Sequence, residues 1–168
     1  LFYSRKVELV GCDNYKSSRQ RDKIKAKIKS ELASGKRNDT IFLDLTFGMT
    51  EGQLQSKLRS LNQAGKITTN SQGHYEYRFE FGESAMIDEA IGTLSAEYYD
   101  GKLYRLIISF EAGGLYTSGD LLKMKLLKLF TMKYGYDYLE RNSLISDYED
   151  YIFIMGNLQV EIISSIEG

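Results

Sequence analysis

The pattern of apolar and polar positions predicts a helix over residues 51–64. Its apolar stripe consists of three leucines at helical spacing, Leu54, Leu58 and Leu61. Thr50 precedes the helix as an N-cap residue, and Gln53 stands at the third helical position, so that the two form a capping box. Gly65 follows at the position where a helix commonly ends in a left-handed residue. Both ends of this helix are therefore specified locally.

A second helix is predicted over residues 17–34, although part of it also resembles a strand. Residues 23–29 alternate lysine with an apolar residue, and this period of two is typical of a strand. We favour a helix because most surrounding residues have high helix propensity and because Ser34 and Gly35 provide a stop. The apolar stripe of this helix is formed by Ile24, Ile28 and Leu32.

A third helix is predicted over residues 120–134, where apolar residues extend almost all the way round and are interrupted by lysines. Such a helix either lies against a sheet with a second surface also covered, or extends its lysines outward from a broad apolar face.

Alternating residues predict two separate strands. Residues 40–47 carry apolar side chains at every second position, and residues 74–81 place four aromatic side chains on one face and polar ones on the other. Two hairpins are also predicted. Asp100-Gly101 is a two-residue turn that joins strands over 93–99 and 102–111.

The second hairpin has Gly156-Asn157 as its turn, between strands over 151–155 and 158–165. Consecutive hairpins with few helices indicate an α+β fold, a two-layer sandwich with helices packed on one face of a mainly antiparallel sheet. We expect a basic N-terminal arm over residues 1–39, with a helix near 17–34, and a single α+β domain over 40–168.

The composition supports a hydrophobic core that needs no disulfide or metal. The chain has 168 residues, of which 42% are hydrophobic and 27% charged, enough for one globular domain. The single cysteine, Cys12, cannot form a disulfide within one chain.

Charge is unevenly distributed along the chain. Residues 1–37 hold eleven Lys or Arg against four Asp or Glu, a net charge of +7, which leaves −8 on the remainder. This asymmetry indicates either a basic arm with an anionic partner or two parts of the protein that attract each other. The candidate residues for binding an anionic surface are Lys16, Arg19, Arg21, Lys23, Lys25, Lys27 and Lys29.

Few residues are suited to catalysis. His74 is the only histidine, which excludes motifs that need two, and its predicted strand face is polar, as solvent-exposed strand faces usually are. The glycines complete no phosphate-binding pattern, and the acidic clusters at 137–140 and 147–150 lack the spacing of a calcium loop. We expect no catalytic residues, no metal ligands and no cofactor.

Tyrosines offer a candidate binding surface on the sheet. Three of them fall on or near neighbouring predicted strands, where their rings are suited to stacking on a ligand: Tyr98, Tyr104 and Tyr116. The alternative is that they belong to the core and to cross-strand pairs.

Residues 47–54, with the sequence Phe-Gly-Met-Thr-Glu-Gly-Gln-Leu, resemble the opening of small bacterial envelope domains. These are the SmpA/OmlA outer-membrane assembly lipoproteins and the β-lactamase-inhibitor-protein-like modules. Residues 98–104 are similar to the strand, turn and strand that follow in such domains, although Gly65-Lys66 replaces their frequent glycine-proline. The resemblance implies a non-enzymatic protein-interaction domain in the cell envelope, built as a two-layer sandwich.

An envelope location, either periplasmic or membrane-tethered, also fits the beginning of the chain. Leu1, Phe2 and Tyr3 precede the charged Arg5 and Lys6, as at the end of an apolar segment.

The leading interpretation is thus a non-enzymatic, envelope-associated binding or protein-interaction domain. Its partner would be another protein or an envelope component, or an anionic membrane surface; nucleic acid is disfavoured on the sheet because Glu76 and Glu80 repel phosphate. Two alternatives stay open. One is binding of nucleic acid or an anionic surface through the arm, and the other is a small hydrolase with paired carboxylates.

Overall fold

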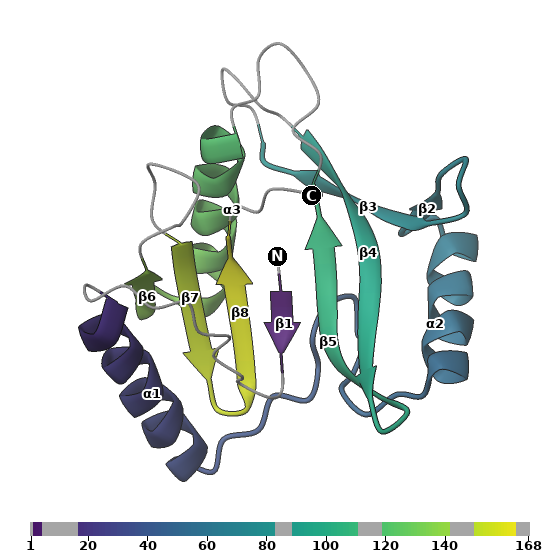
Figure 1. The fold of residues 1–168 in the computed structure, drawn as a ribbon. Coiled ribbons are helices and arrows are strands. Elements are labelled where there is room, and N and C mark those ends of the chain that lie inside the picture. Colours follow the sequence, from purple (N-terminus) through teal and green to yellow (C-terminus); the bar gives the residue numbers. More distant parts are fainter. Residues whose placement is uncertain (1, 5–16, 83–88, 111–118, 142–149, 164–168) are drawn as a thin grey trace.

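The computed structural model confirms the α+β class (Figure 1). It describes residues 2–4, 17–82, 89–110, 119–141 and 150–163, and the structural statements below concern these residues. The helices are α1 (Ser17–Ala33), α2 (Glu51–Gln63) and α3 (Gly119–Tyr134). The strands are β1 (Phe2–Ser4), β2 (Thr68–Thr69), β3 (Tyr75–Glu80), β4 (Glu89–Tyr99), β5 (Lys102–Ser109), β6 (Tyr138–Arg141), β7 (Asp150–Met155) and β8 (Leu158–Ile162).

The strands form an antiparallel sheet in the order β2-β3-β4-β5-β1-β8-β7-β6. It has one half made of β2 to β5 and another made of β6 to β8, and β1 pairs with β5 on one side and with β8 on the other. Tyr3, for example, lies between Leu106 and Val160. Phe2 and Tyr3 therefore belong to a strand between the two halves.

The local signals around α2 are confirmed. The backbone N–H of Thr50 donates to the side-chain oxygen of Gln53 (2.8 Å), and the N–H of Gln53 donates to the Thr50 hydroxyl (3.3 Å), which completes the capping box. At the other end, the N–H of Lys66 donates to the carbonyl of Leu61 (2.9 Å), as in a Schellman motif with Gly65 in the left-handed region. The three predicted leucines are buried.

Both predicted hairpins are confirmed as well. Asp100 and Gly101 have φ values of 50° and 67°, the positive values that a type I′ turn requires, and join β4 to β5. Gly156 and Asn157 join β7 to β8, but of these two residues only Gly156 has a positive φ value, of 60°, as at the first position of a type II′ turn.

Residues 40–47 do not form the predicted strand. Their ends make an isolated bridge, and the chain reverses between them at Leu43 and Asp44, which have positive φ values of 51° and 58°. The neighbouring residues Ile41 and Phe42 are both buried. An extended strand points neighbouring side chains to opposite faces, so the turn buries more of this apolar segment than a strand would.

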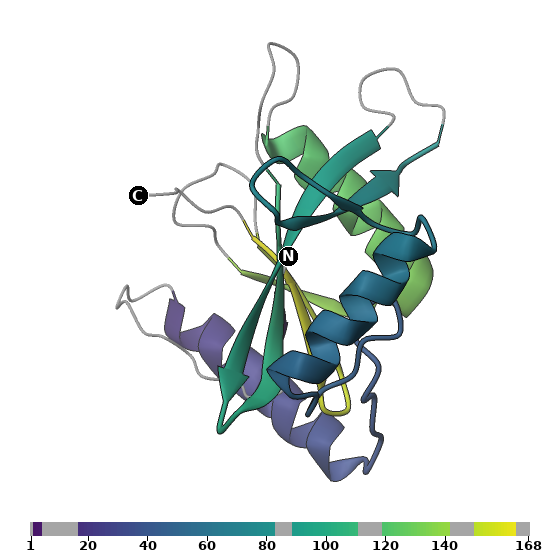
Figure 2. The same ribbon diagram turned by 90° about the vertical axis from the view of Figure 1, so that its right-hand side faces the viewer.

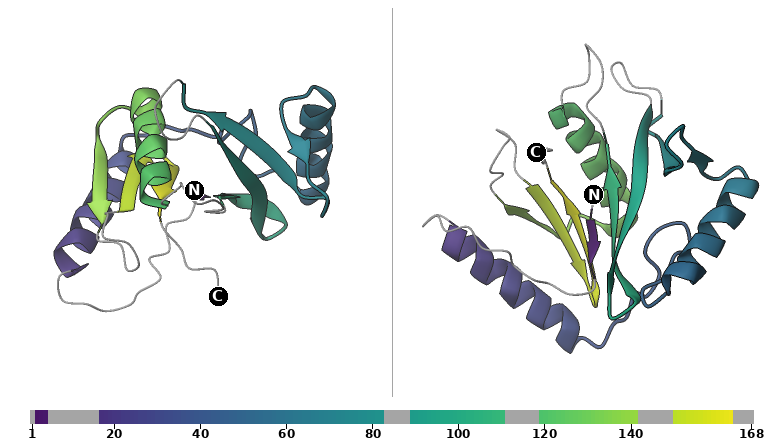
Figure 3. Two further views of the ribbon diagram at one scale, coloured as in Figure 1. Left: turned by 90° about the horizontal axis from the view of Figure 1, so that it is seen from above. Right: turned by 45° about the vertical axis from the view of Figure 1, so that its right-hand side comes forward.

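The helices lie on both faces of the sheet. Phe153 of β7 belongs to the main core, which α2 and α3 cover, whereas Ile152 and Ile154 pack against Ile24 of α1. Because successive strand residues point to opposite faces, α1 lies opposite α3 (Figure 2). The expectation that the helices share one face is correct for α2 and α3 and wrong for α1. Figure 3 shows that α1 and α2 lie at opposite ends of the sheet.

We expect the substitution Gly156→Ala to destabilise the protein strongly. A Cβ at this position would lie 2.2 Å from the backbone carbonyl oxygen of Lys36, and φ is 60°. The matched control is Gly101→Ala, where φ is 67° and a Cβ would meet no atom within 4 Å. Urea unfolding should give a loss of about 3 kcal/mol or more for Gly156→Ala and about 1–2 kcal/mol for the control. Equal losses would contradict the close approach of the two segments.

Candidate functional site

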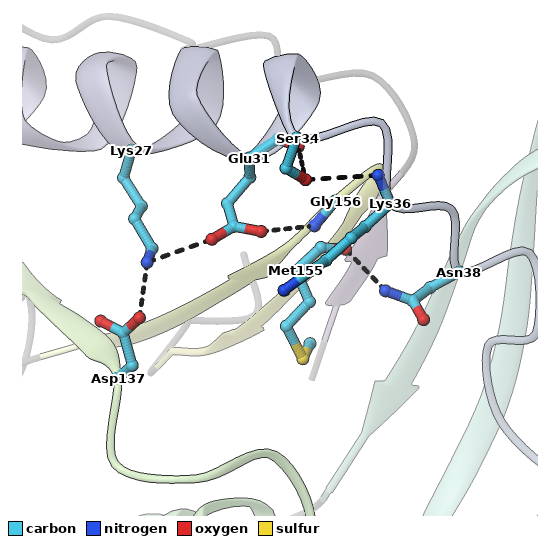
Figure 4. A network of polar contacts seen from close by, with 8 residues as sticks. All are labelled: Lys27, Glu31, Ser34, Lys36, Asn38, Asp137, Met155 and Gly156. Carbon is cyan, nitrogen blue, oxygen red and sulfur yellow. Dashed lines mark hydrogen bonds and ion pairs between the residues drawn. The ribbon is translucent and has the colours of Figure 1, made fainter.

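The predicted basic surface belongs to α1, and this helix is docked on the sheet. Ile24 is 1% exposed and packs against Ile152 and Ile154. Lys27 is half-buried, donates a hydrogen bond to Asp137 just before β6, and pairs with Glu31 at 3.2 Å (Figure 4). Both apolar and polar contacts therefore hold α1 in place.

Glu31 ties α1 to the turn of the β7–β8 hairpin. The backbone N–H of Gly156 donates to the Glu31 carboxylate (2.9 Å), and this bond, together with Lys27, lowers the pKa of Glu31. The hydrogen bond to Asp137 raises the pKa of Lys27. Farther along the chain, the side-chain amide of Asn38 donates to the carbonyl of Met155 (2.8 Å). Figure 4 shows these contacts along one side of the hairpin.

The structure separates the predicted cations into two groups. The outward face of α1 carries four exposed ones: Arg19, Lys23, Lys25 and Lys29. Arg21 and Lys27 are half-buried, and Lys16 lies outside the described residues. Asp22 is the one exposed acid of α1, so this face has a net positive charge.

The predicted tyrosines make contacts within the protein. Tyr98 is half-buried against the main core, and burial, with a contribution from the charge of Glu51, raises its pKa. The hydroxyl of Tyr104 donates to Glu97 (2.7 Å). Tyr116 lies outside the described residues.

One acid of the two predicted acidic clusters lies in a buried ion-pair network. The Asp150 carboxylate contacts Lys123 at 2.9 Å and Arg141 at 3.3 Å, and Arg141 also contacts Glu161 at 3.2 Å. Lys123, one of the lysines of α3, is thus directed inward instead of outward. The Asp150 carboxylate is thus held between two cations of neighbouring elements, which is the geometry of a structural ion pair.

A cleft of about 620 Å³ lies between β3 and the C-terminal half of α3. We call it the β3–α3 cleft. Leu129, Phe130 and Lys133 line it from α3, and residues 76–80 line it from β3. Residues 65–68, at the start of β2, also contribute. Successive residues of β3, which belong to alternating faces of the strand, all line this cleft, which means that the cleft follows the outer edge of the strand.

Aromatic side chains form the apolar part of the cleft. Phe42 stacks on Phe79 with ring centroids 5.6 Å apart, and Tyr77 meets the edge of Phe42 at 4.9 Å. Phe79 and Phe130 are each 3% exposed, while Tyr77 and Leu129 are half-buried. The turn in residues 40–47 brings Phe42 to this place.

The rim of the cleft carries exposed charges. Lys66 and Lys133 are exposed cations, and Lys133 lies 5.1 Å from the ring centre of Tyr134. Arg78 donates to the Glu89 carboxylate of β4 (2.7 Å), so its charge is compensated within the sheet. Glu80 is the exposed acid of the rim.

The sequence carries no signal for this cleft, because five separate segments line it. The alternation over 74–81 correctly predicted the aromatic face of β3 but gave no sign that the strand lies near an edge of the sheet. His74, the one histidine, is exposed in the turn before β3. In the described ranges, no group of three or more His, Cys, Asp or Glu side chains is arranged to hold a metal ion.

No family model, curated protein or solved structure matches this chain. None of the helices in the described part of the chain combines the length and apolar character that a membrane span requires.

We expect the contribution of Glu31 to stability to depend on pH. Its lowered pKa means that the contribution is present above the ordinary value of 4.5 and is lost as the pH falls through the native pKa. Glu31→Gln should therefore lower the free energy of unfolding by about 1–2 kcal/mol at neutral pH, and the difference from wild type should narrow towards pH ~3. Urea unfolding across this range measures both.

Asp22→Asn is the matched control for this experiment, because Asp22 is exposed on the same helix. It should show little loss at any pH. A loss for Glu31→Gln that stays constant from neutral to acid pH would contradict the assigned role of the carboxylate.

Proposed function

We propose that this protein is a non-enzymatic protein-interaction domain of the bacterial cell envelope, and that the β3–α3 cleft binds a segment of its partner. The observation that carries the proposal is the cleft itself. Its volume of about 620 Å³ lies in the range of ligand sites, and it combines an aromatic wall with exposed cations. The envelope location rests on the resemblance of residues 47–54.

The chemistry of the cleft indicates the kind of segment it would bind. Tyr77 and Leu129 are half-buried, so part of each side chain remains available for apolar contact. Lys66 and Lys133 add positive charge beside that apolar surface. A segment with both apolar and acidic side chains matches this combination.

We expect a displayed library of random seven-residue peptides to yield binders that need the cleft cations. Recovered peptides should bind the wild type and should lose about tenfold or more in affinity for the double variant Lys66→Glu/Lys133→Glu, because two attractions become repulsions of about 0.5–1 kcal/mol each. Isothermal titration of the recovered peptides measures the loss.

The matched control is Lys25→Glu/Lys29→Glu, which makes the same change in charge on the outward face of α1. It should bind the recovered peptides as wild type does. A library that yields no binder above background, or binders with equal affinity for all three proteins, would count against the proposed function.

The outward face of α1 supports a second candidate function, binding to an anionic membrane surface. Arg19, Lys23, Lys25 and Lys29 are exposed there with Asp22 as the accompanying acid. Each cation near an anionic leaflet contributes about 1 kcal/mol at physiological salt. The docked position of α1 leaves these side chains available, while Ile24 and Ile28 of its apolar stripe pack on the sheet and Leu32, the third predicted member, is exposed.

For this function we expect the protein to bind vesicles that contain about a quarter phosphatidylserine and to sediment together with them. Lys25→Gln/Lys29→Gln should lower the partition coefficient about thirtyfold, because two contributions of about 1 kcal/mol are lost. Lys66→Gln/Lys133→Gln removes two cations elsewhere and serves as the control. Sedimentation that is insensitive to salt, or equally reduced in both variants, would exclude the α1 face as the binding surface.

A further inference from the structure

The backbone of β3 has an open edge along the cleft. The carbonyl of His74 accepts a hydrogen bond from the N–H of Asn70 (2.9 Å), which places the backbone groups of His74 on the β2 side. Backbone groups in an antiparallel strand alternate between its two sides, so those of Glu76, Arg78 and Glu80 point the same way. The pairing with β2 ends at Glu76, opposite Thr68. Within the described ranges no strand pairs with Arg78 and Glu80 on that side.

The cleft provides space for side chains beside this edge. Leu129 and Lys133 are four residues apart and therefore lie on the same side of α3, which lines the cleft opposite β3. A chain placed along the edge would direct every second side chain towards Tyr77, Phe79 and the α3 wall. The other side chains would lie on the open face of the sheet, beside Arg78. An edge strand next to a helix thus offers both main-chain hydrogen bonds and side-chain contacts.

We infer that the partner segment binds in an extended conformation and adds a strand to the edge of β3. Its backbone hydrogen-bonds to Arg78 and Glu80, and its inward side chains are apolar with at least one carboxylate near Lys66 or Lys133. This inference rests on the proposed function and specifies how the same cleft binds its partner. The occupant is an extended segment of another protein.

The charges around the edge favour this occupant. Charged side chains often protect an edge strand from pairing, but the Arg78 side chain is directed towards Glu89 across the sheet and leaves its own backbone accessible. The two cations of the rim lie on the side towards which inward side chains would point. At the inward positions they favour a carboxylate over a cation, while Glu76 and Glu80 lie on the opposite face of β3 and act on the outward positions. The site thus has a charge preference in addition to the sequence-independent backbone bonds.

Amide hydrogen exchange, followed by NMR, tests the inference directly. The probe is the tightest seven-residue peptide recovered from the displayed library, added to the full chain at saturation. When the peptide is bound, the exchange rates of the amides of Arg78 and Glu80 should fall by about tenfold or more. The amides of Tyr77 and Phe79, which face β4, serve as internal controls and should change little.

A second measurement uses the peptide itself. Methylation of single backbone nitrogens removes one donor at a time, so alternate positions should lose about tenfold or more in affinity while the positions between them tolerate the change. An equal loss of affinity on methylation at every position of the peptide would overturn the inference of strand addition.

The possible failures are distinguishable. A peptide that shifts the resonances of Leu129 and Lys133 without protecting Arg78 and Glu80 leaves the proposed function intact and overturns the inference. Protection of these two amides in the free protein that grows with protein concentration would make a second copy of the chain the occupant, and would also overturn it. A library without binders overturns both.

Discussion

Strand β7 has to be shielded from water on both faces, and this requirement fixes the positions of two of the three helices. Ile152, Phe153 and Ile154 are each 5% exposed or less, although neighbouring strand residues point to opposite faces. Burial of each such side chain contributes about 1.5–3 kcal/mol, so a β7 with one open face would lose a large share of a typical folding free energy. The docking of α1 follows from this need. Its apolar contact through Ile24 is the main attraction, and the bonds of Lys27 and Glu31 fix how the helix lies on the hairpin.

The same strand explains why a cleft is present beside β3. Phe130 and Tyr134 of α3 pack on Phe153 at ring distances of 6.5 and 6.1 Å, which holds α3 over the β6–β8 half of the sheet. The opposite flank of α3 then faces the other half, where β2 covers only the first part of β3 because it has two residues. A longer β2 would pair with Arg78 and Glu80 and would fill the space between strand and helix. The cleft is therefore a consequence of where one helix is held and where one strand ends.

Elements with local signals were predicted from the sequence, and elements that depend on distant partners were not. Thr50 and Gln53 bond to each other across three residues, and Asp100-Gly101 needs only its own two positive φ values, so α2 and the hairpin were correct. The strand predicted over residues 40–47 was wrong. The alternation of apolar residues there is typical of a strand, but the turn at Leu43 is stabilised by burial of Phe42 against β3. β6 was not predicted, because the ring contact of Tyr138 with Phe153, at 5.4 Å, joins two segments that are separate in the sequence. The cleft was missed for the same reason.

Most of the positive charge on α1 does not take part in docking this helix to the rest of the protein. The arm and the remainder carry opposite net charges, yet among the described residues the docking of α1 uses the ion pair between Lys27 and Asp137, while four cations stay on its outward face. Positive charge is thus presented both there and at the rim of the cleft, by Lys66 and Lys133. An acidic partner is attracted to either surface with similar strength, because exposed charges act over about 8–10 Å with little dependence on shape. Discrimination between the two has to come from short-range features. The cleft has an aromatic wall and an unpaired backbone edge, and the outward face of α1 has neither, since a helix satisfies its own backbone groups.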